Sequence, residues 1–230
     1  MGKLIYAADD EQDIREVVGM FLRDAGFTVE LFDTGDALLA AFRQAPCDLA
    51  ILDVMMPGTD GIAVCAQLRQ LSRVPVILLT ARDSETDYAR GYHSGGDDYM
   101  TKPFRPSVLV MKARALLRRG AAETEEEGAL DCAGLHFSRQ SMQVTCAGHD
   151  LRLTMTELRL LRHLMAHCGS ALSRDALLKE VWDFDLHVES RVVDETVRRV
   201  RSKMALAGST ARIRAVWGYG YRLEGGEAMP

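Results

Sequence analysis

The sequence predicts two domains: an α/β doubly wound five-stranded parallel sheet over residues 1–119, and an α+β winged helix-turn-helix over residues 129–227. Three observations support this division. Short apolar runs alternate with amphipathic stretches as far as residue 119, which is the pattern of repeated βα units. The alternation stops at "GAAETEEEG", residues 120–128. Short alternating segments, three helical stretches and a hairpin pattern follow it.

The first domain is predicted from five strand-like runs and the helices between them. The predicted strands are Leu4–Ala8, Thr28–Leu31, Leu49–Leu52, Val76–Leu79 and Asp98–Met100. The predicted helices are Asp13–Ala25, Gly35–Gln44, Ile62–Leu71, Glu85–Ser94 and Ser107–Arg119. Because βα crossovers are right-handed, the helices cover both faces of the sheet, and we expect the strand order 2-1-3-4-5.

The segment 120–128 is predicted to be a short acidic linker. It has no periodicity and carries four glutamates, as expected of a solvated connection. The alternative is an acidic extension of the preceding helix. The 14 basic and 12 acidic residues of 129–230 give a charge of +2, although the whole chain carries −5. A mildly basic module behind an acidic break indicates two different functions.

The second domain begins with the alternating segments "GLHFSR", "QVTCAG" and "DLRL", which predict a small antiparallel sheet. Helices are expected over Thr156–Cys168, Arg174–Trp182 and Ser190–Ala207. Thr154 and Glu157 have the spacing of a capping box at the start of the first helix. The ending "IRAVWGYGYRL" predicts a β-hairpin that turns at its glycines.

Composition excludes several classes of protein. No apolar stretch approaches the roughly 20 residues that span a bilayer, and the first residues lack the apolar core of a signal peptide, so we expect a cytoplasmic protein without a membrane partner. The five cysteines have no paired C-x-x-C spacing. They are expected to be reduced, small apolar residues rather than a zinc site or a redox switch.

Acidic residues gather where two predicted strands end. Asp9, Asp10 and Glu11 follow the first strand, and Asp53 ends the third. These strands are neighbours in the expected order, so their carboxyl ends meet at the crevice where doubly wound sheets bind ligands. Carboxylates this close repel unless a cation lies among them, and oxygen ligands favour Mg²⁺. The alternative is a solvated set of loop acids.

The ends of two further strands favour a ligand-binding site over a solvated set of acids. Thr80 ends the fourth strand, and Lys102, followed by Pro103, lies near the end of the fifth. A hydroxyl and an ammonium opposite a metal are suited to a phosphoryl group. Asp53 would then be the nucleophile that attacks phosphorus.

Residues 1–119 resemble the receiver domain of two-component response regulators. The resemblance rests on "DDE", "LDVMMPGTDG", "ILLTAR" and "GGDDYMTKPF". It implies that Asp53 accepts phosphoryl from a sensor histidine kinase and that Thr80 and Lys102 contact the phosphoryl oxygens. Tyr99 would be the switch aromatic, and the Lys102–Pro103 bond would be cis. The implied ligands of Mg²⁺ are Asp9, Asp10, Asp53 and the backbone carbonyl of Met55.

The same resemblance implies a symmetric homodimer on phosphorylation, held by charge pairs. The residues at the expected positions are Arg90, Asp97, Asp98, Lys112 and Arg119. An ordinary solvated face is the alternative. Val108 stands where relatives usually carry the acid that pairs with Arg90, so one charge pair of the dimer is missing.

The second domain resembles the winged-helix effector of the OmpR/PhoB family, through "LTMTELRLL", "SRVVDETVRRVRSKM" and "VWGYGYRL". The cations of its third helix favour a recognition helix in the DNA major groove. Expected DNA contacts are Arg191, Thr196, Arg198, Arg199, Arg201 and Lys203, with Arg199 the best candidate for contacting a base. The hairpin would be the wing. The resemblance implies that the wing approaches the minor groove. Trp217 and Tyr219 depart from the common pattern of an arginine and a small residue, so Trp217 is expected to pack on the domain instead, and an arginine contact with the minor groove is excluded at this position.

The function predicted from these features is a phosphorylation-activated, DNA-binding transcription regulator that is not an enzyme and binds repeated half-sites. Residues 183–188 lie where some relatives contact RNA polymerase. One alternative is a protein-binding regulator whose winged helix does not read DNA. A phosphatase is another, but Met55 occupies the position of its second acid. A regulator that works without phosphorylation is the third.

Overall fold

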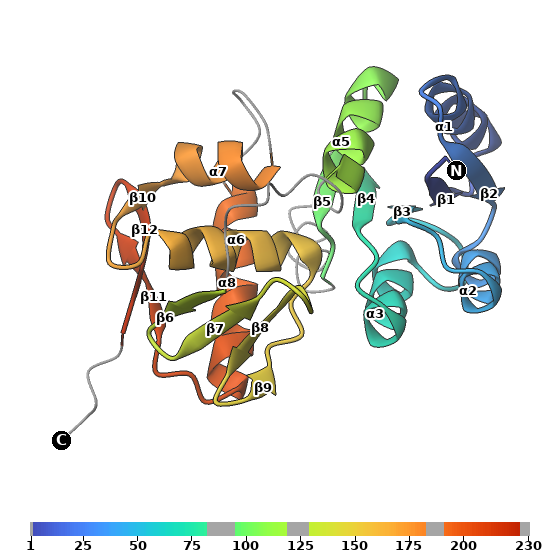
Figure 1. Ribbon diagram of the computed structural model, residues 1–230. Helices are drawn as coiled ribbons and strands as arrows, with labels where there is room; N and C mark the ends of the chain where they lie inside the picture. The colour runs from blue at the N-terminus through green and yellow to red at the C-terminus, as the bar shows by residue number, and fades with distance from the viewer. Residues whose placement is uncertain (1, 82–94, 119–128, 183–190, 226–230) are drawn as a thin grey trace. The chain divides into compact units, whose positions relative to one another are not determined.

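The structure, a computed structural model, describes residues 2–81, 95–118, 129–182 and 191–225 (Figure 1). The chain divides into two compact units, Met1–Glu123 and Thr124–Pro230. The predicted linker 120–128 and the predicted helix Glu85–Ser94 lie outside the described residues, as does the segment 183–188.

The first unit is a parallel five-stranded sheet in the order β2-β1-β3-β4-β5, as predicted. Its strands are β1 (Leu4–Ala8), β2 (Thr28–Phe32), β3 (Leu49–Asp53), β4 (Val76–Ala81) and β5 (Asp98–Lys102). Its described helices are α1 (Gln12–Asp24), α2 (Gly35–Gln44), α3 (Gly61–Leu71) and α5 (Pro106–Arg118). Four strands, β2 to β5, extend beyond their predicted ends, so that Asp53 and Lys102 are themselves strand residues.

The core of this unit lies on both faces of the central strands. All five residues of β3 are buried, as expected for a strand covered by helices on each side. Helices α1 and α5 pack on one face and α2 and α3 on the other (Figure 1). The cluster on the first face includes Ile5, Ile51, Ile77 and Leu109. This rigid centre positions the residues that follow each strand.

The second unit has the arrangement of a winged helix. It opens with an antiparallel sheet of β6 (Leu130–Cys132), β7 (Leu135–Ser138), β8 (Gln143–Cys146) and β9 (His149–Asp150). The helices are α6 (Met155–Ala166), α7 (Arg174–Trp182) and α8 (Arg191–Leu206). A second sheet has the order β10-β12-β11, from β10 (Leu172–Ser173), β11 (Arg212–Val216) and β12 (Gly220–Glu224). No helix in the described ranges is long and apolar enough to cross a membrane.

The expectation that all five cysteines are reduced is wrong for two of them. Cys132 and Cys168 form a disulfide with an S–S distance of 2.06 Å. Cys47, Cys65 and Cys146 are free and buried, as expected. The pair is 36 residues apart in the chain, and it meets because β6 packs against α6. No spacing rule identifies such a pair, since only the tertiary fold brings it together.

Candidate functional site

The phosphoryl-acceptor candidate, Asp53, lies at the carboxyl end of the central strand β3. Leu52 is paired with Ala8 of β1, and Asp53 with Leu79 of β4. The residue after Ala8 is Asp9, and the residue after Leu79 is Thr80. The register therefore brings both beside Asp53 at one edge of the sheet, as predicted from the strand ends.

Lys102 connects the acids of this edge. Its Nζ lies 2.7 Å from Oδ2 of Asp53, 2.9 Å from Oδ2 of Asp9 and 3.3 Å from Oε1 of Glu11. The side chains of Asp53 and Asp9 are each only 4% exposed. One ammonium therefore holds two buried carboxylates that arrive from β1 and β3.

The backbone holds the other oxygen of each buried acid. The Met55 amide donates to Oδ1 of Asp53 at 3.1 Å, and the Glu11 amide donates to Oδ1 of Asp9 at 3.0 Å. Met55 itself is exposed. The nucleophile candidate is thus fixed in orientation by a strand, an amide and an ammonium.

Helix α3 begins directly against the backbone of Asp53. A Cβ on Gly61 would lie 2.0 Å from the Asp53 carbonyl oxygen, so only glycine permits this approach. Asp60 caps the helix by accepting from the Ala63 amide at 2.7 Å. The turn "PGTDG" therefore brings the chain back against the backbone of Asp53.

The electrostatics of the acids favour binding of a cation. Burial raises the pKa of both Asp9 and Asp53, and the contacts with Lys102 lower these pKa values only in part. The ligand oxygens of Asp9, Asp10 and Asp53 lie within 4.8 Å of one another. Lys102 alone does not balance three carboxylates, and an all-oxygen set of this kind suits Mg²⁺. The residues present fit the metal that the receiver resemblance implies.

The two remaining receiver residues are buried near the same edge. Thr80 is 2% exposed and Tyr99 is 9% exposed. The hydroxyl of Tyr99 lies close to Gly96, since a Cβ on Gly96 would be 2.8 Å from it. The ring is therefore already inside in this conformation. The peptide bond Lys102–Pro103 is cis, as the resemblance implied.

Three of the five residues expected on a dimer face are paired inside their own domain. Asp97 contacts Arg69 at 2.6 Å, and Asp98 contacts Lys112 at 2.7 Å. Asp97, Asp98 and Lys112 are all buried, where a carboxylate needs an opposite charge. An exposed face is predicted for these charges from the sequence, whereas the structure pairs them inside the receiver; their role in a dimer stays a prediction. Arg90 and Arg119 lie outside the described residues.

The recognition helix candidate, α8, presents fewer of its cations than the sequence suggested. Arg199 is 7% exposed, and its Nε donates to Oε1 of Glu157 at 3.0 Å. Lys203 donates to Oε2 of the same glutamate at 2.5 Å. Thr196 is fully buried and donates to the Val192 carbonyl. The base-contact expectation for Arg199 therefore does not match its position, because the side chain forms a buried ion pair.

Glu157 explains this arrangement. It also accepts from the Thr154 amide and completes the predicted capping box of α6. The cap is predictable from the sequence but the ion pairs are not, because they join residues more than 40 positions apart. The pattern gave no signal that one glutamate serves both helices.

Several exposed cations of this unit lie on α8 and the hairpin. Arg198 contacts Glu195 at 2.8 Å and keeps a side chain that is 42% exposed. Arg201 donates to the Ile213 carbonyl at 2.8 Å, while Arg212 and Arg214 are exposed on β11. The side chain of Arg191 lies outside the described residues. Sequence analysis missed Arg212 and Arg214, although their alternate spacing places them on one face of a strand.

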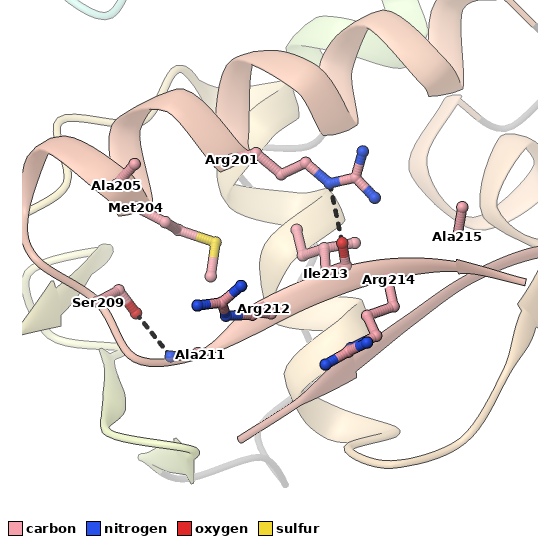
Figure 2. Close-up of a pocket in the computed structure, with 9 residues that line it drawn as sticks. All are labelled: Arg201, Met204, Ala205, Ser209, Ala211, Arg212, Ile213, Arg214 and Ala215. Atoms are coloured by element: carbon pink, nitrogen blue, oxygen red, sulfur yellow. Dashed lines mark hydrogen bonds between the residues drawn. The ribbon is translucent and has the colours of Figure 1, made fainter. Parts of the chain in front are cut away.

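A groove lies between α8 and β11, and three of these arginines line it (Figure 2). Its volume is about 630 Å³. Arg201, Arg212 and Arg214 line it, over apolar side chains that include Met204 and Ile213. Figure 2 shows the hydrogen bond from Arg201 to the Ile213 carbonyl, which ties the helix to the strand. The groove combines positive charge with an apolar floor.

Comparison with known proteins matches both units. Residues 5–114 match the response regulator receiver domain, and residues 148–223 match the C-terminal domain of transcriptional regulatory proteins. The chain is 42% identical to the transcriptional regulatory protein AfsQ1 of Streptomyces coelicolor, over 97% of this chain and 99% of that protein. It is 37% identical to ResD of Bacillus subtilis, over 96% of each.

Solved structures agree with this match. The response regulator DrrB of Thermotoga maritima, an OmpR/PhoB homologue, is 29% identical with a TM-score of 0.52, over 98% of this chain and 100% of that one. A RitR variant with 23% identity and a TM-score of 0.78 shares the fold over 98% of this chain and 100% of its own. With an acidic receiver site in its first unit and a winged helix as its second, the chain belongs to the OmpR/PhoB family of response regulators, the phosphorylation-dependent DNA-binding regulators of two-component systems.

Proposed function

We propose that Asp53 accepts the phosphoryl group from a sensor histidine kinase. The observation that carries the proposal is the bridge of Lys102 between Asp53 and Asp9. A carboxylate oxygen of Asp53 forms a bond to phosphorus, the P–N bond of the phosphohistidine breaks, and the imidazole leaves. Lys102 then contacts the new phosphoryl oxygens together with Thr80. The chain turns over no substrate of its own in this role.

The acids around Asp53 would hold the metal that this reaction needs. We assign the ligands to Asp9, Asp10, Asp53 and the backbone carbonyl of Met55. Mg²⁺, when bound, supplies positive charge that stabilises the transferring phosphoryl group. The protein contributes two buried carboxylates already held by Lys102 and by backbone amides.

The signal leaves the site through Thr80 and Tyr99. Attraction of the Thr80 hydroxyl to the phosphoryl oxygens would stabilise the inward position of Tyr99 relative to an outward one. The structure supports this by burying both side chains. We also propose that phosphorylation promotes a homodimer. Arg90 and Arg119 are the remaining candidates for charge pairs across its interface, and position 108 carries a valine instead of the acid that would pair with Arg90.

Double-stranded DNA is the partner of the second unit. Arg198 and Arg201 on α8 are the base and phosphate candidates, and the arginines of β11 extend the same positive surface. A protein whose partner is chromosomal DNA works in the cytoplasm, and we infer that location from the DNA-binding role. Arg191 and a contact of residues 183–188 with RNA polymerase stay predictions.

The test combines phosphorylation with DNA binding. Purified protein is incubated with acetyl phosphate and Mg²⁺, and genome-wide binding is compared with and without the phosphodonor. We expect one phosphoryl group per chain by intact mass, no phosphoryl group on Asp53→Asn, and stronger occupancy after phosphorylation. Asp48→Asn is the matched control, because Asp48 pairs with Lys3 at the surface.

The rival readings predict different results. If Asp53→Asn binds DNA as well as the wild type does, and the phosphodonor does not change that binding, the protein is a regulator that works without phosphorylation. Absence of any salt-dependent gel shift supports a winged helix that binds protein instead, since phosphate contacts weaken steeply with salt.

A further inference from the structure

The turn of the C-terminal hairpin presents an exposed tryptophan. Trp217 is 99% exposed, whereas the other tryptophan of the chain, Trp182, is fully buried. Tyr219, two residues further on, is 52% exposed. The expectation that Trp217 packs on the domain is therefore not met. A large apolar side chain held in water gains free energy when a partner covers it.

The turn that carries Trp217 is held in place. Gly218 has φ +68°, a left-handed conformation that favours glycine. The Tyr219 amide donates to the Val216 carbonyl at 3.0 Å, and the Tyr219 carbonyl accepts from the Arg174 amide at 3.2 Å. The indole is thus presented by a fixed turn, so little conformational entropy is lost when it binds.

The surroundings of the hairpin favour a polyanion as the partner. Val216 directly precedes Trp217 at the end of β11, and the same strand carries Arg212 and Arg214 into the groove beside α8 (Figure 2). Acidic compensation comes from Glu224, which contacts Arg214 and Arg222. A positively charged groove along the strand that precedes Trp217, together with an uncharged, flat aromatic ring on the turn, fits duplex DNA. The phosphates pair with the arginines, and the sugars and base faces contact the ring.

We propose that Trp217 is an apolar wedge that enters the DNA minor groove and contacts the edges of base steps. Apolar wedges act in this way by partly unstacking a step, and flexible TA steps yield most easily. An indole has one N–H donor and no charge, so this wing reads the deformability of DNA rather than the charge of a narrow groove. The inference rests on the proposed DNA binding.

The two tryptophans make the test direct. The full-length chain is titrated with two 30-bp duplexes, one of alternating A·T and one of alternating G·C sequence, at equal low salt. Binding is followed by anisotropy of a dye on the DNA, and the indole by its emission and by quenching with acrylamide. Trp182 is buried and contributes a constant background.

We expect emission from Trp217 to shift to the blue and its acrylamide quenching to fall several-fold on binding, with a larger change for the A·T duplex. Trp217→Ala should weaken binding to the A·T duplex about 10-fold and remove the emission change. Trp217→Phe should remove the emission change but retain most of the affinity. Leu206→Ala is the matched control, since Leu206 is 90% exposed on the same unit but outside the hairpin.

Each other outcome contradicts the wedge. The wedge proposal is wrong if DNA binding depends on salt while the indole emission stays unchanged and Trp217→Ala binds as the wild type does. The proposed function would still hold in that case. Equal emission changes with the two duplexes would contradict the proposal that Trp217 distinguishes deformable from stiff DNA. An emission change that follows protein concentration without DNA assigns Trp217 to a protein contact. If neither duplex binds at any salt, the proposed function fails together with the wedge.

Discussion

Each of the two units buries a cluster of charged side chains. Carboxylates outnumber cations in the first cluster, and cations outnumber carboxylates in the second. In the receiver, Lys102 serves both Asp9 and Asp53. In the effector, one glutamate, Glu157, is served by both Arg199 and Lys203. Both clusters are shielded from water, so the ratio of cations to carboxylates decides the sign of each pKa shift.

The pKa values follow that ratio. Burial raises the pKa of Asp9 and Asp53, and one shared ammonium does not reverse the shift. Burial also acts to raise the pKa of Glu157, but its two cations hold that pKa below its ordinary value. The receiver cluster therefore lacks positive charge, and the effector cluster is complete. We infer that the first is arranged to receive a cation and the second to hold helices together.

The largest expected effect comes from breaking the complete cluster. Glu157→Ala removes a helix cap and leaves Arg199 buried without its carboxylate partner. Losing one member of a buried pair costs about 3–5 kcal/mol, so we expect the second unit to unfold at much lower urea and to lose DNA binding. Equilibrium unfolding measured by Trp182 fluorescence gives the value.

Glu195→Ala is the control for this prediction. Glu195 pairs with Arg198 at the surface of α8, where an ion pair contributes about 0.2–1 kcal/mol. Equal losses for Glu157→Ala and Glu195→Ala would show that burial does not distinguish the two pairs.

The second effect separates covalent from ionic stabilisation of the same unit. The Cys132–Cys168 disulfide closes a loop between residues 36 positions apart, and the loop-entropy relation gives about 3–4 kcal/mol for that length. We expect Cys132→Ala/Cys168→Ala to lower the free energy of unfolding by this amount, and thiol titration of the unfolded, unreduced chain to find three reactive thiols.

Cys146→Ala is the matched control, because Cys146 is a free buried thiol of the same unit. It removes one thiol from the titration and opens no loop. Five reactive thiols in the wild-type chain would contradict the disulfide, and a double variant as stable as wild type would assign the stabilisation to the ion pairs alone.

The sequence predicted the receiver cluster better than the effector cluster, for a physical reason. Asp9, Asp53, Thr80 and Lys102 each follow or end a strand, and parallel strands bring their carboxyl ends together by topology alone. The partners of Arg199 depend on how α6 crosses α8, which no local pattern encodes. The same limit applies to Cys132 with Cys168 and to the buried pair of Asp98 with Lys112, two residues that the resemblance placed on a dimer face.

A smaller effect of opposite sign is expected in the receiver. The folded-state pKa of Asp53 is raised above its unfolded value, so ionisation favours the unfolded chain, and stability is lost as pH rises through the raised pKa. The penalty is fully present at pH values above the raised pKa, where Asp53→Asn should stabilise the first unit by about 1 kcal/mol. Thermal unfolding of wild type and variant measures the difference.

That difference should shrink as the pH falls through the raised pKa of Asp53, and it should also shrink when millimolar Mg²⁺ is added to the wild type at pH 7. Asp48→Asn is expected to behave oppositely, because the Lys3 ammonium and the Leu4 amide hold the pKa of Asp48 below its ordinary value despite the effect of burial. A stability gain in Asp53→Asn that is indifferent to both pH and Mg²⁺ would contradict charge repulsion as its cause.

The smallest effect on stability tests neighbouring arginines of α8 that differ in burial. Arg198 pairs at the surface and Arg199 pairs in the core. Arg198→Ala should change the free energy of unfolding by less than about 0.5 kcal/mol, yet weaken DNA binding about 10-fold because it removes an exposed cation from the recognition surface. Arg199→Ala should lower the free energy of unfolding. It should lower DNA affinity only to the extent that less of the protein is folded. DNA affinity measured at equal folded fraction separates the two, and a direct base contact by Arg199 would reverse their order.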